Sequence, residues 1–148
     1  MKYSCFLTCL MTSLSCFADS DVLTGKWKTI DDRTGYALTE VTIRKNKQGL
    51  YEGAITKLYP IPGTKVKDTC THCTGEFKDK PYIGTVFIWG LKQSKNNPSE
   101  FVDGKILDPV DGKLYDGKAK LNRKGNRMII RGYLNNSPIG RSATWIKQ

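Results

Sequence analysis

The chain has a single histidine, His72, among its 148 residues. A Ser-His-Asp or Cys-His relay would depend on this residue, and any other general base near neutral pH would be a perturbed carboxylate. Beyond residue 18, cysteine and histidine number only three, one ligand short of a structural zinc site. Asp31 and Asp32 belong to an ordinary turn sequence, DDRTG. We therefore expect no enzyme, no metal site and no cofactor.

Long apolar runs are also lacking, except at the N-terminus. Lys2 precedes a mostly apolar stretch over residues 3–17, and Ala18 ends a small-x-small site. This pattern predicts a signal peptide over residues 1–18, because the run is too short and too rich in Ser, Thr and Cys to cross a bilayer. Cleavage would leave one domain, residues 19–148, exported to the periplasm or the extracellular space and not membrane-spanning.

Acidic residues are few, with 14 against 24 Lys and Arg, for a net charge of +10. Such a charge attracts anionic partners, including an anionic surface or polymer and an acidic protein. The lysines are spread along the chain, which is more typical of a solvated basic surface than of a dedicated polyanion site. Interleaved aromatic and basic residues also resemble a base-stacking surface, but the predicted export argues against nucleic acid.

No amphipathic helical pattern longer than a turn or two is present, whereas alternating apolar residues are frequent. Residues 100–120 predict a β-hairpin with Pro109 and Gly112 in its turn, and most of the remaining chain repeats this pattern of strand, turn and strand. Its apolar positions are Val102 and Ile106 on one arm and Tyr115, Ala119 and Leu121 on the other. The strands are expected at residues 25–30, 38–45, 50–59, 83–91, 100–107, 113–120, 127–134 and 140–147.

Eight sequential hairpin-connected strands leave two exposed edges unless the sheet closes on itself. The pattern therefore predicts an all-β fold, an eight-stranded antiparallel up-and-down barrel, with a two-sheet sandwich as the alternative. A barrel of this size is either filled by side chains or holds one small ligand.

Cys70 and Cys73 are the cysteines that remain after removal of the predicted leader. They lie in a long connection, residues 60–82, where Pro and Gly break every periodic pattern. Export and an even pair predict a disulfide that ties this connection down. A redox pair with His72 between the cysteines and a metal site are the alternatives.

Aromatic residues recur on the predicted strands and are candidates to line a barrel cavity. The candidate ligand-binding residues are Trp27, Tyr51, Phe87, Trp89, Tyr115 and Tyr133, although such residues more often form the core. The function that follows is binding of a small, partly apolar ligand. The alternative is an envelope protein that binds a protein or anionic polymer through its basic surface, without a ligand cavity.

Motifs along the chain resemble a bacterial exported family that is known as a domain of unknown function with a lipocalin-like barrel. They lie at residues 27–35, 70–76, 79–84, 104–115, 131–133 and 140–145. The resemblance implies the barrel fold and carries over no catalytic residues. In the lipocalin pattern, a first-strand tryptophan is packed by an arginine from the closing strand. By that resemblance, Trp27 and Arg141 are expected to pack together and close the barrel.

Overall fold

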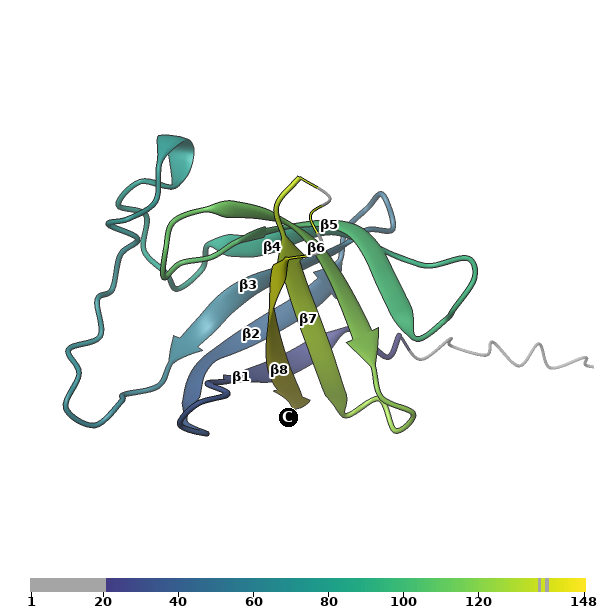
Figure 1. The fold of residues 1–148 in the computed structure, drawn as a ribbon, viewed down its shortest axis with the longest axis horizontal. Helices are drawn as coiled ribbons and strands as arrows, with labels where there is room; N and C mark the ends of the chain where they lie inside the picture. Colours follow the sequence, from purple (N-terminus) through teal and green to yellow (C-terminus); the bar gives the residue numbers. More distant parts are fainter. Residues whose placement is uncertain (1–20, 136, 138) are drawn as a thin grey trace, which may run out of the picture.

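The computed structural model describes residues 21–135, 137 and 139–148, which form eight β-strands and one 3-10 helix (Figure 1). The elements are β1 (Gly25–Ile30), β2 (Ala37–Lys45), β3 (Tyr51–Leu58), η1 (Gly75–Phe77), β4 (Val86–Gln93), β5 (Glu100–Leu107), β6 (Leu114–Leu121), β7 (Arg127–Tyr133) and β8 (Gly140–Lys147). The predicted signal peptide, residues 1–18, lies outside the described residues. Within the described ranges, none of the helices has the length and apolar character needed to cross a bilayer.

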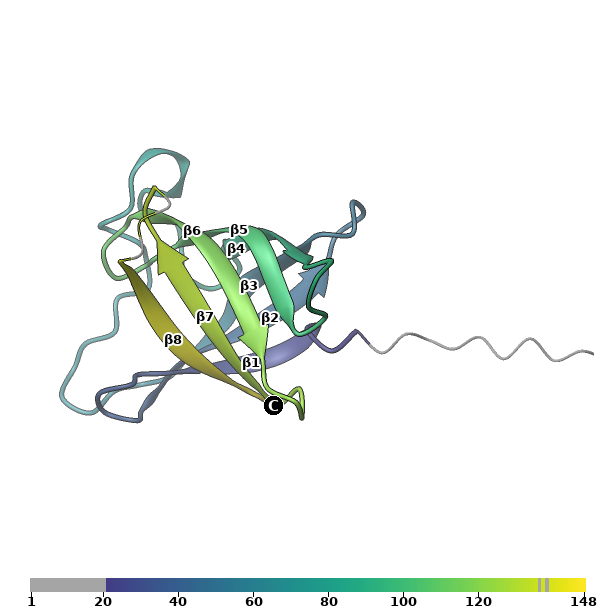
Figure 2. The same cartoon turned by 45° about the vertical axis from the view of Figure 1, so that its right-hand side comes forward.

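The strands pair in sequence order and close into a barrel, as the sequence predicts (Figure 2). The closing pair is antiparallel and joins β1 to β8, with Trp27 opposite Lys147 and Ile30 opposite Thr144. Closure gives each strand a hydrogen-bonded neighbour on both sides, so the sheet has no free edge. The two-sheet sandwich is therefore excluded.

The predicted contact between Trp27 and Arg141 is wrong, although the strands that carry the two residues are neighbours. Arg141 lies six residues before Lys147 along β8, which is about 20 Å in an extended strand. Its side chain is 72% exposed and pairs with Asp108, with Nη1 3.6 Å from Oδ2. The position over the Trp27 ring belongs to Lys147, whose Nζ lies 5.3 Å from the ring centroid.

Four hairpin turns share one hydrogen-bond pattern. The side-chain oxygen of an Asp or Asn at the start of the turn accepts from the backbone N–H of the residue two or four positions later. The turns begin at Asp31, Asn46, Asp108 and Asn122. Such side chains mimic a backbone turn, which is why Asp and Asn are favoured there. At Asp31, the bond from the Arg33 amide is the main reason that the pKa of the carboxyl lies below its ordinary value.

A bulge in β5 changes which side chains of the hairpin over residues 100–120 face the barrel interior, so the predicted shared face of Val102 and Ile106 is wrong. The register with β6 shifts between Phe101 and Gly104, and Asp103 has a φ of 60°. Because the extra residue reverses the alternation, Phe101 and Gly104 are both buried, while Val102 is half-buried and does not share a face with Ile106. Phe101, at 1% exposure, is one of the largest fully buried side chains.

The middle of the barrel is filled by side chains. The buried apolar residues on the strands include Trp27, Val41, Ile43, Ile55, Leu91, Phe101, Ala119, Met128, Ile130 and Trp145. Two glycines that pair across β5 and β6 make room for their neighbours: a Cβ on Gly104 would lie 2.6 Å from Leu91, and one on Gly117 would lie 2.5 Å from Ile106. A ligand could therefore enter at an end of the barrel but not pass through it.

The long connection between β3 and β4 is tied down, as predicted. Cys70 and Cys73 form a disulfide with their Cα atoms 5.3 Å apart, and both residues are buried. Backbone bonds from Cys70 N to Lys80 O and from Asp79 N to Cys70 O fold the segment back on itself. The Tyr82 hydroxyl donates to the carbonyl of Pro109 at 3.3 Å, which docks the connection on the β5–β6 turn.

Candidate ligand-binding site

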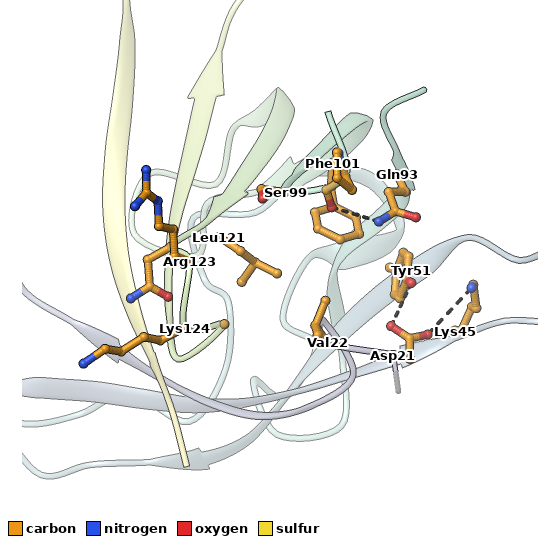
Figure 3. A pocket seen from close by; sticks show the side chains of 13 residues that line it. Asp21, Val22, Lys45, Tyr51, Gln93, Ser99, Phe101, Leu121, Arg123 and Lys124 are labelled. Carbon is orange, nitrogen blue, oxygen red and sulfur yellow. Dashed lines mark hydrogen bonds and ion pairs between the residues drawn. The ribbon is translucent and has the colours of Figure 1, made fainter. Parts of the chain in front are cut away.

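A pocket of about 480 Å³ lies at one end of the barrel, and we call it the mouth pocket (Figure 3). It is surrounded by the β2–β3, β4–β5 and β6–β7 turns and by the residues that precede β1. Its lining residues are Asp21, Val22, Lys45, Tyr51, Gln93, Pro98, Ser99, Phe101, Leu121, Asn122, Arg123, Lys124 and Gly125. Segments as far apart as residues 21 and 125 thus meet at one site.

The floor of the mouth pocket is apolar and well packed. Phe101, Leu121 and Tyr51 are each at most 6% exposed, so they continue the barrel core up to the pocket. The rings of Tyr51 and Phe101 meet edge to face, with centroids 5.3 Å apart and an interplanar angle of 89°. This arrangement holds both aromatic side chains in defined positions.

One side of the mouth is formed by the segment that leads into β1. Leu23 is fully buried, and its carbonyl accepts a hydrogen bond of 2.9 Å from Nε1 of Trp27. The carbonyl of Val22 accepts a bond of 2.6 Å from Nζ of Lys147. The segment is therefore anchored to the first and last strands, while the Val22 side chain stays 43% exposed at the pocket.

A small polar group lies on the wall of the mouth pocket beside β3. The Tyr51 hydroxyl donates to Oδ1 of Asp21 at 2.8 Å, and Nζ of Lys45 lies 3.7 Å from Oδ2. Figure 3 shows these three side chains on one side of the pocket and Arg123 and Lys124 on the other. Three cations and one carboxylate therefore border the pocket, so its rim is net positive and favours anionic ligands.

The six predicted ligand-binding residues do not converge on one cavity. Tyr51 lines the mouth pocket, Trp27 is fully buried in the core, and Phe87 is buried with its ring 6.0 Å from that of Tyr82. Trp89 stacks on Phe77 of η1, with centroids 5.8 Å apart.

The last two of these candidates are half-buried and lie away from the mouth pocket. Tyr133 pairs in register with Asp116. The hydroxyl of Tyr115 donates to the carboxylate of Asp111, and this bond is the main cause that raises the pKa of Tyr115 to about 12. That ligands bind at these residues remains a prediction.

Sequence reasoning missed most of the polar lining of the pocket. Asp21, Lys45, Arg123 and Lys124 lie in turns or beside them, where charged residues are the norm, so nothing in their local pattern marks them. A sequence signal does exist in the closed barrel itself: alternate turns of an up-and-down barrel lie at the same end. The barrel topology alone therefore places the β2–β3, β4–β5 and β6–β7 turns at the same end of the barrel.

The cysteine pair and two strand aspartates, Asp103 and Asp116, are already engaged with other residues and so are weaker candidates for a chemical site than the mouth pocket. Cys70 is 1% exposed and bonded to Cys73, so it is not an exposed thiol beside His72. Asp103 and Asp116 each pair with a lysine of a neighbouring strand, Lys92 and Lys105. Within the described ranges, no cluster of three or more His, Cys, Asp or Glu side chains is arranged to hold a metal ion.

The barrel is similar in fold to a solved structure, that of protein HP1028 from the human pathogen Helicobacter pylori, and that protein is described as belonging to the lipocalin family. The two structures superpose with a TM-score of 0.67 at 20% sequence identity, over 85% of this chain and 82% of that one. The barrel is therefore lipocalin-like, and identity this low establishes the fold alone.

Comparison of the sequence itself shows the family of the chain. No curated protein matches the chain. A family model, in contrast, covers residues 25–147, from the start of β1 to the end of β8, and thus the whole barrel. The chain belongs to the bacterial family described as "uncharacterized protein conserved in bacteria (DUF2147)".

Proposed function

We propose that this protein is exported and binds a small, partly apolar molecule in the mouth pocket. The observation that carries the proposal is the pocket itself: about 480 Å³ in volume, with a packed apolar floor and a rim on which polar and charged side chains predominate. Ligand sites in proteins are typically about 300–1,000 Å³, and the mouth pocket lies within this range, with a lining that is more polar than that of most such sites. The filled middle of the barrel limits the ligand to one that fits this end.

The outer wall gives weaker support to binding of a polyanion. Several of its cations lie opposite acids on neighbouring strands, as in the pairs Lys26–Glu40, Arg44–Glu52 and Lys120–Glu100. Such pairs neutralise part of the positive charge of the wall, so the excess of lysine acts there with reduced strength. We therefore favour the pocket over the wall.

The binding proposal is tested with N-phenyl-1-naphthylamine, an uncharged probe whose fluorescence increases in apolar surroundings. Val22→Trp places a large side chain in the mouth pocket at a position that is 43% exposed, so the fold should tolerate it. The matched control is Val110→Trp, at a 67% exposed position in the β5–β6 turn at the other end of the barrel. The probe is excited beyond the absorption of tryptophan, so the added indoles do not interfere.

We expect the unmodified chain and Val110→Trp to bind the probe alike, and Val22→Trp to bind it roughly tenfold more weakly, a loss of about 1.4 kcal/mol. Equal binding by all three proteins would show that the probe enters elsewhere, and the proposal would be wrong.

Export is tested separately, by N-terminal sequencing of the chain recovered from the periplasm and medium of a bacterial host. The pattern of Lys2, an apolar run and Ala18 predicts that the exported protein starts at Asp19. Recovery of the chain in the cytoplasm with residues 1–18 intact would contradict the proposal.

A further inference from the structure

We infer that Lys45 and Tyr51 form a carboxylate-binding subsite in the mouth pocket, that the side chain of Asp21 occupies this subsite in the free protein, and that a ligand carboxylate displaces it. The inference rests on the proposed function, because it concerns the same pocket. It specifies the ligand as an apolar molecule with a terminal carboxylate.

The two donors are placed by a rigid element. Lys45 ends β2 and Tyr51 begins β3, and the two residues are register partners across the hairpin. Nζ of Lys45 lies 5.1 Å from the centroid of the Tyr51 ring, and the ring itself is held edge to face by Phe101. The packed ring therefore holds the Tyr51 hydroxyl in place whether or not Asp21 is present, while the Lys45 side chain, 49% exposed, keeps its ammonium near this ring.

The two groups face the two oxygens of one carboxylate, one through a hydrogen bond and the other through an ion pair. The Tyr51 hydroxyl reaches Oδ1 of Asp21 at 2.8 Å, and the Lys45 ammonium lies 3.7 Å from Oδ2 (Figure 3). A hydroxyl donor at one oxygen and a cation near the other suit any planar carboxylate, because a hydrogen bond to a charged acceptor is stronger than a neutral one and the cation adds Coulomb attraction. Asp21 thus marks where the head of such a ligand would lie.

Asp21 itself is held less firmly than Tyr51. It precedes β1 by four residues and belongs to no strand, and its side chain remains 25% exposed. The anchors of this segment, the carbonyls of Val22 and Leu23, follow Asp21 in the chain, so its carboxylate can swing out without breaking them.

The space beside the subsite suits an apolar chain. Phe101 packs against Tyr51, and Leu121 and Val22 complete the lining nearby (Figure 3). A carboxylate bound at Lys45 and Tyr51 would therefore place its hydrocarbon tail over the apolar floor. Arg123 and Lys124, across the pocket, would attract the anion as it approaches but do not contact the head.

The test uses octanoate and octan-1-ol, which have chains of equal length but differ in head group, as competitors of N-phenyl-1-naphthylamine. They are compared on the unmodified chain, on Asp21→Ala and on Asp32→Ala. The last variant removes the same charge from an exposed position in the β1–β2 turn at the opposite end of the barrel. It therefore reports any general effect of a more positive protein.

We expect Asp21→Ala to bind octanoate roughly five- to tenfold more tightly than the unmodified chain, as loss of a competing charged hydrogen bond implies. Octan-1-ol affinity should stay the same, and Asp32→Ala should change neither. Adding Tyr51→Phe or Lys45→Met to Asp21→Ala should remove most of the gain for octanoate while octan-1-ol still binds.

Each other outcome is distinct. An unchanged octanoate affinity in Asp21→Ala, an equal gain in Asp32→Ala, or loss of probe binding in Asp21→Ala would overturn the inference and leave the proposed function standing. If the probe does not bind the unmodified chain at all, the proposed function fails, and the inference fails with it.

Discussion

The ammonium of Lys147 lies over the indole of Trp27, with Nζ 5.3 Å from the ring centroid, and donates to the carbonyl of Val22 at 2.6 Å. Trp27 and Lys147 are also register partners between the first and last strands. One side chain near the C-terminus therefore joins the closing strand, the first strand and the segment that borders the mouth pocket. This contact replaces the arginine that the lipocalin pattern led us to expect.

Lys147→Met should destabilise the protein by about 1–2 kcal/mol, because it retains the apolar stem but removes the cation over the ring and the donor to Val22. The matched variant Arg141→Met removes an exposed surface ion pair to Asp108 and should change stability by less than about 1 kcal/mol. Urea unfolding of both variants measures the difference. A larger loss for Arg141→Met would contradict the register assigned to the closing strands.

Gly112→Ala should destabilise the docking of the disulfide-bearing connection. Gly112 has a φ of 72°, and a Cβ at this position would overlap the carbonyl of His72. Gly49→Ala is the control, since Gly49 has a φ of 78° and open space around it. The control should lose only the roughly 1–2 kcal/mol of a left-handed alanine, and Gly112→Ala clearly more. Similar losses in thermal unfolding would mean that the connection does not pack there.

Replacement of Cys70 and Cys73 together by serine should leave the barrel folded. Four residues close a small loop, so the chain-entropy model assigns the disulfide only about 2 kcal/mol. We expect faster hydrogen exchange at the amides of Cys70 and Asp79, which are bonded within the connection, and unchanged exchange on the strands. Global unfolding of the double variant, or two freely alkylated thiols in the oxidised native protein, would contradict this account.

The phenol of Tyr115 should lose its proton at a higher pH than an ordinary tyrosine, because its pKa is raised. The hydrogen bond from its hydroxyl to the Asp111 carboxylate stabilises the protonated phenol and raises the pKa to about 12, above the ordinary value of 10. Because the folded pKa is the higher one, this stabilisation is complete below pH 10 and is lost as the pH rises through 12. Ultraviolet titration should show one fewer late tyrosine in Tyr115→Phe. Asp111→Asn should move the same tyrosine to lower pH, and an unchanged titration in Asp111→Asn would refute the assigned cause.

Local patterns were sufficient to predict the strands. In β1 and β8 the predicted ranges match those observed, because Gly and the turn residues that flank these strands interrupt the alternation sharply. The least accurate boundary is the start of β4, predicted at residue 83 and observed at Val86, where a proline-containing connection leads into the strand. The face of β5 was also misjudged, since Asp103 carries no sequence mark of a bulge.

The amino-acid sequence by itself determined eight antiparallel strands joined by hairpin turns, because period-two alternation and turns are encoded by neighbouring residues. The tertiary structure decided that these strands close into one barrel through the pairing of β1 with β8. Only the tertiary structure decided that Lys147 and not Arg141 covers Trp27, and that Asp21, Lys45 and Tyr51 meet at the mouth. The physical reason is that register across the closing seam, and the path of the segment before β1, depend on how side chains from distant strands fill the interior. No local pattern along the chain carries that information.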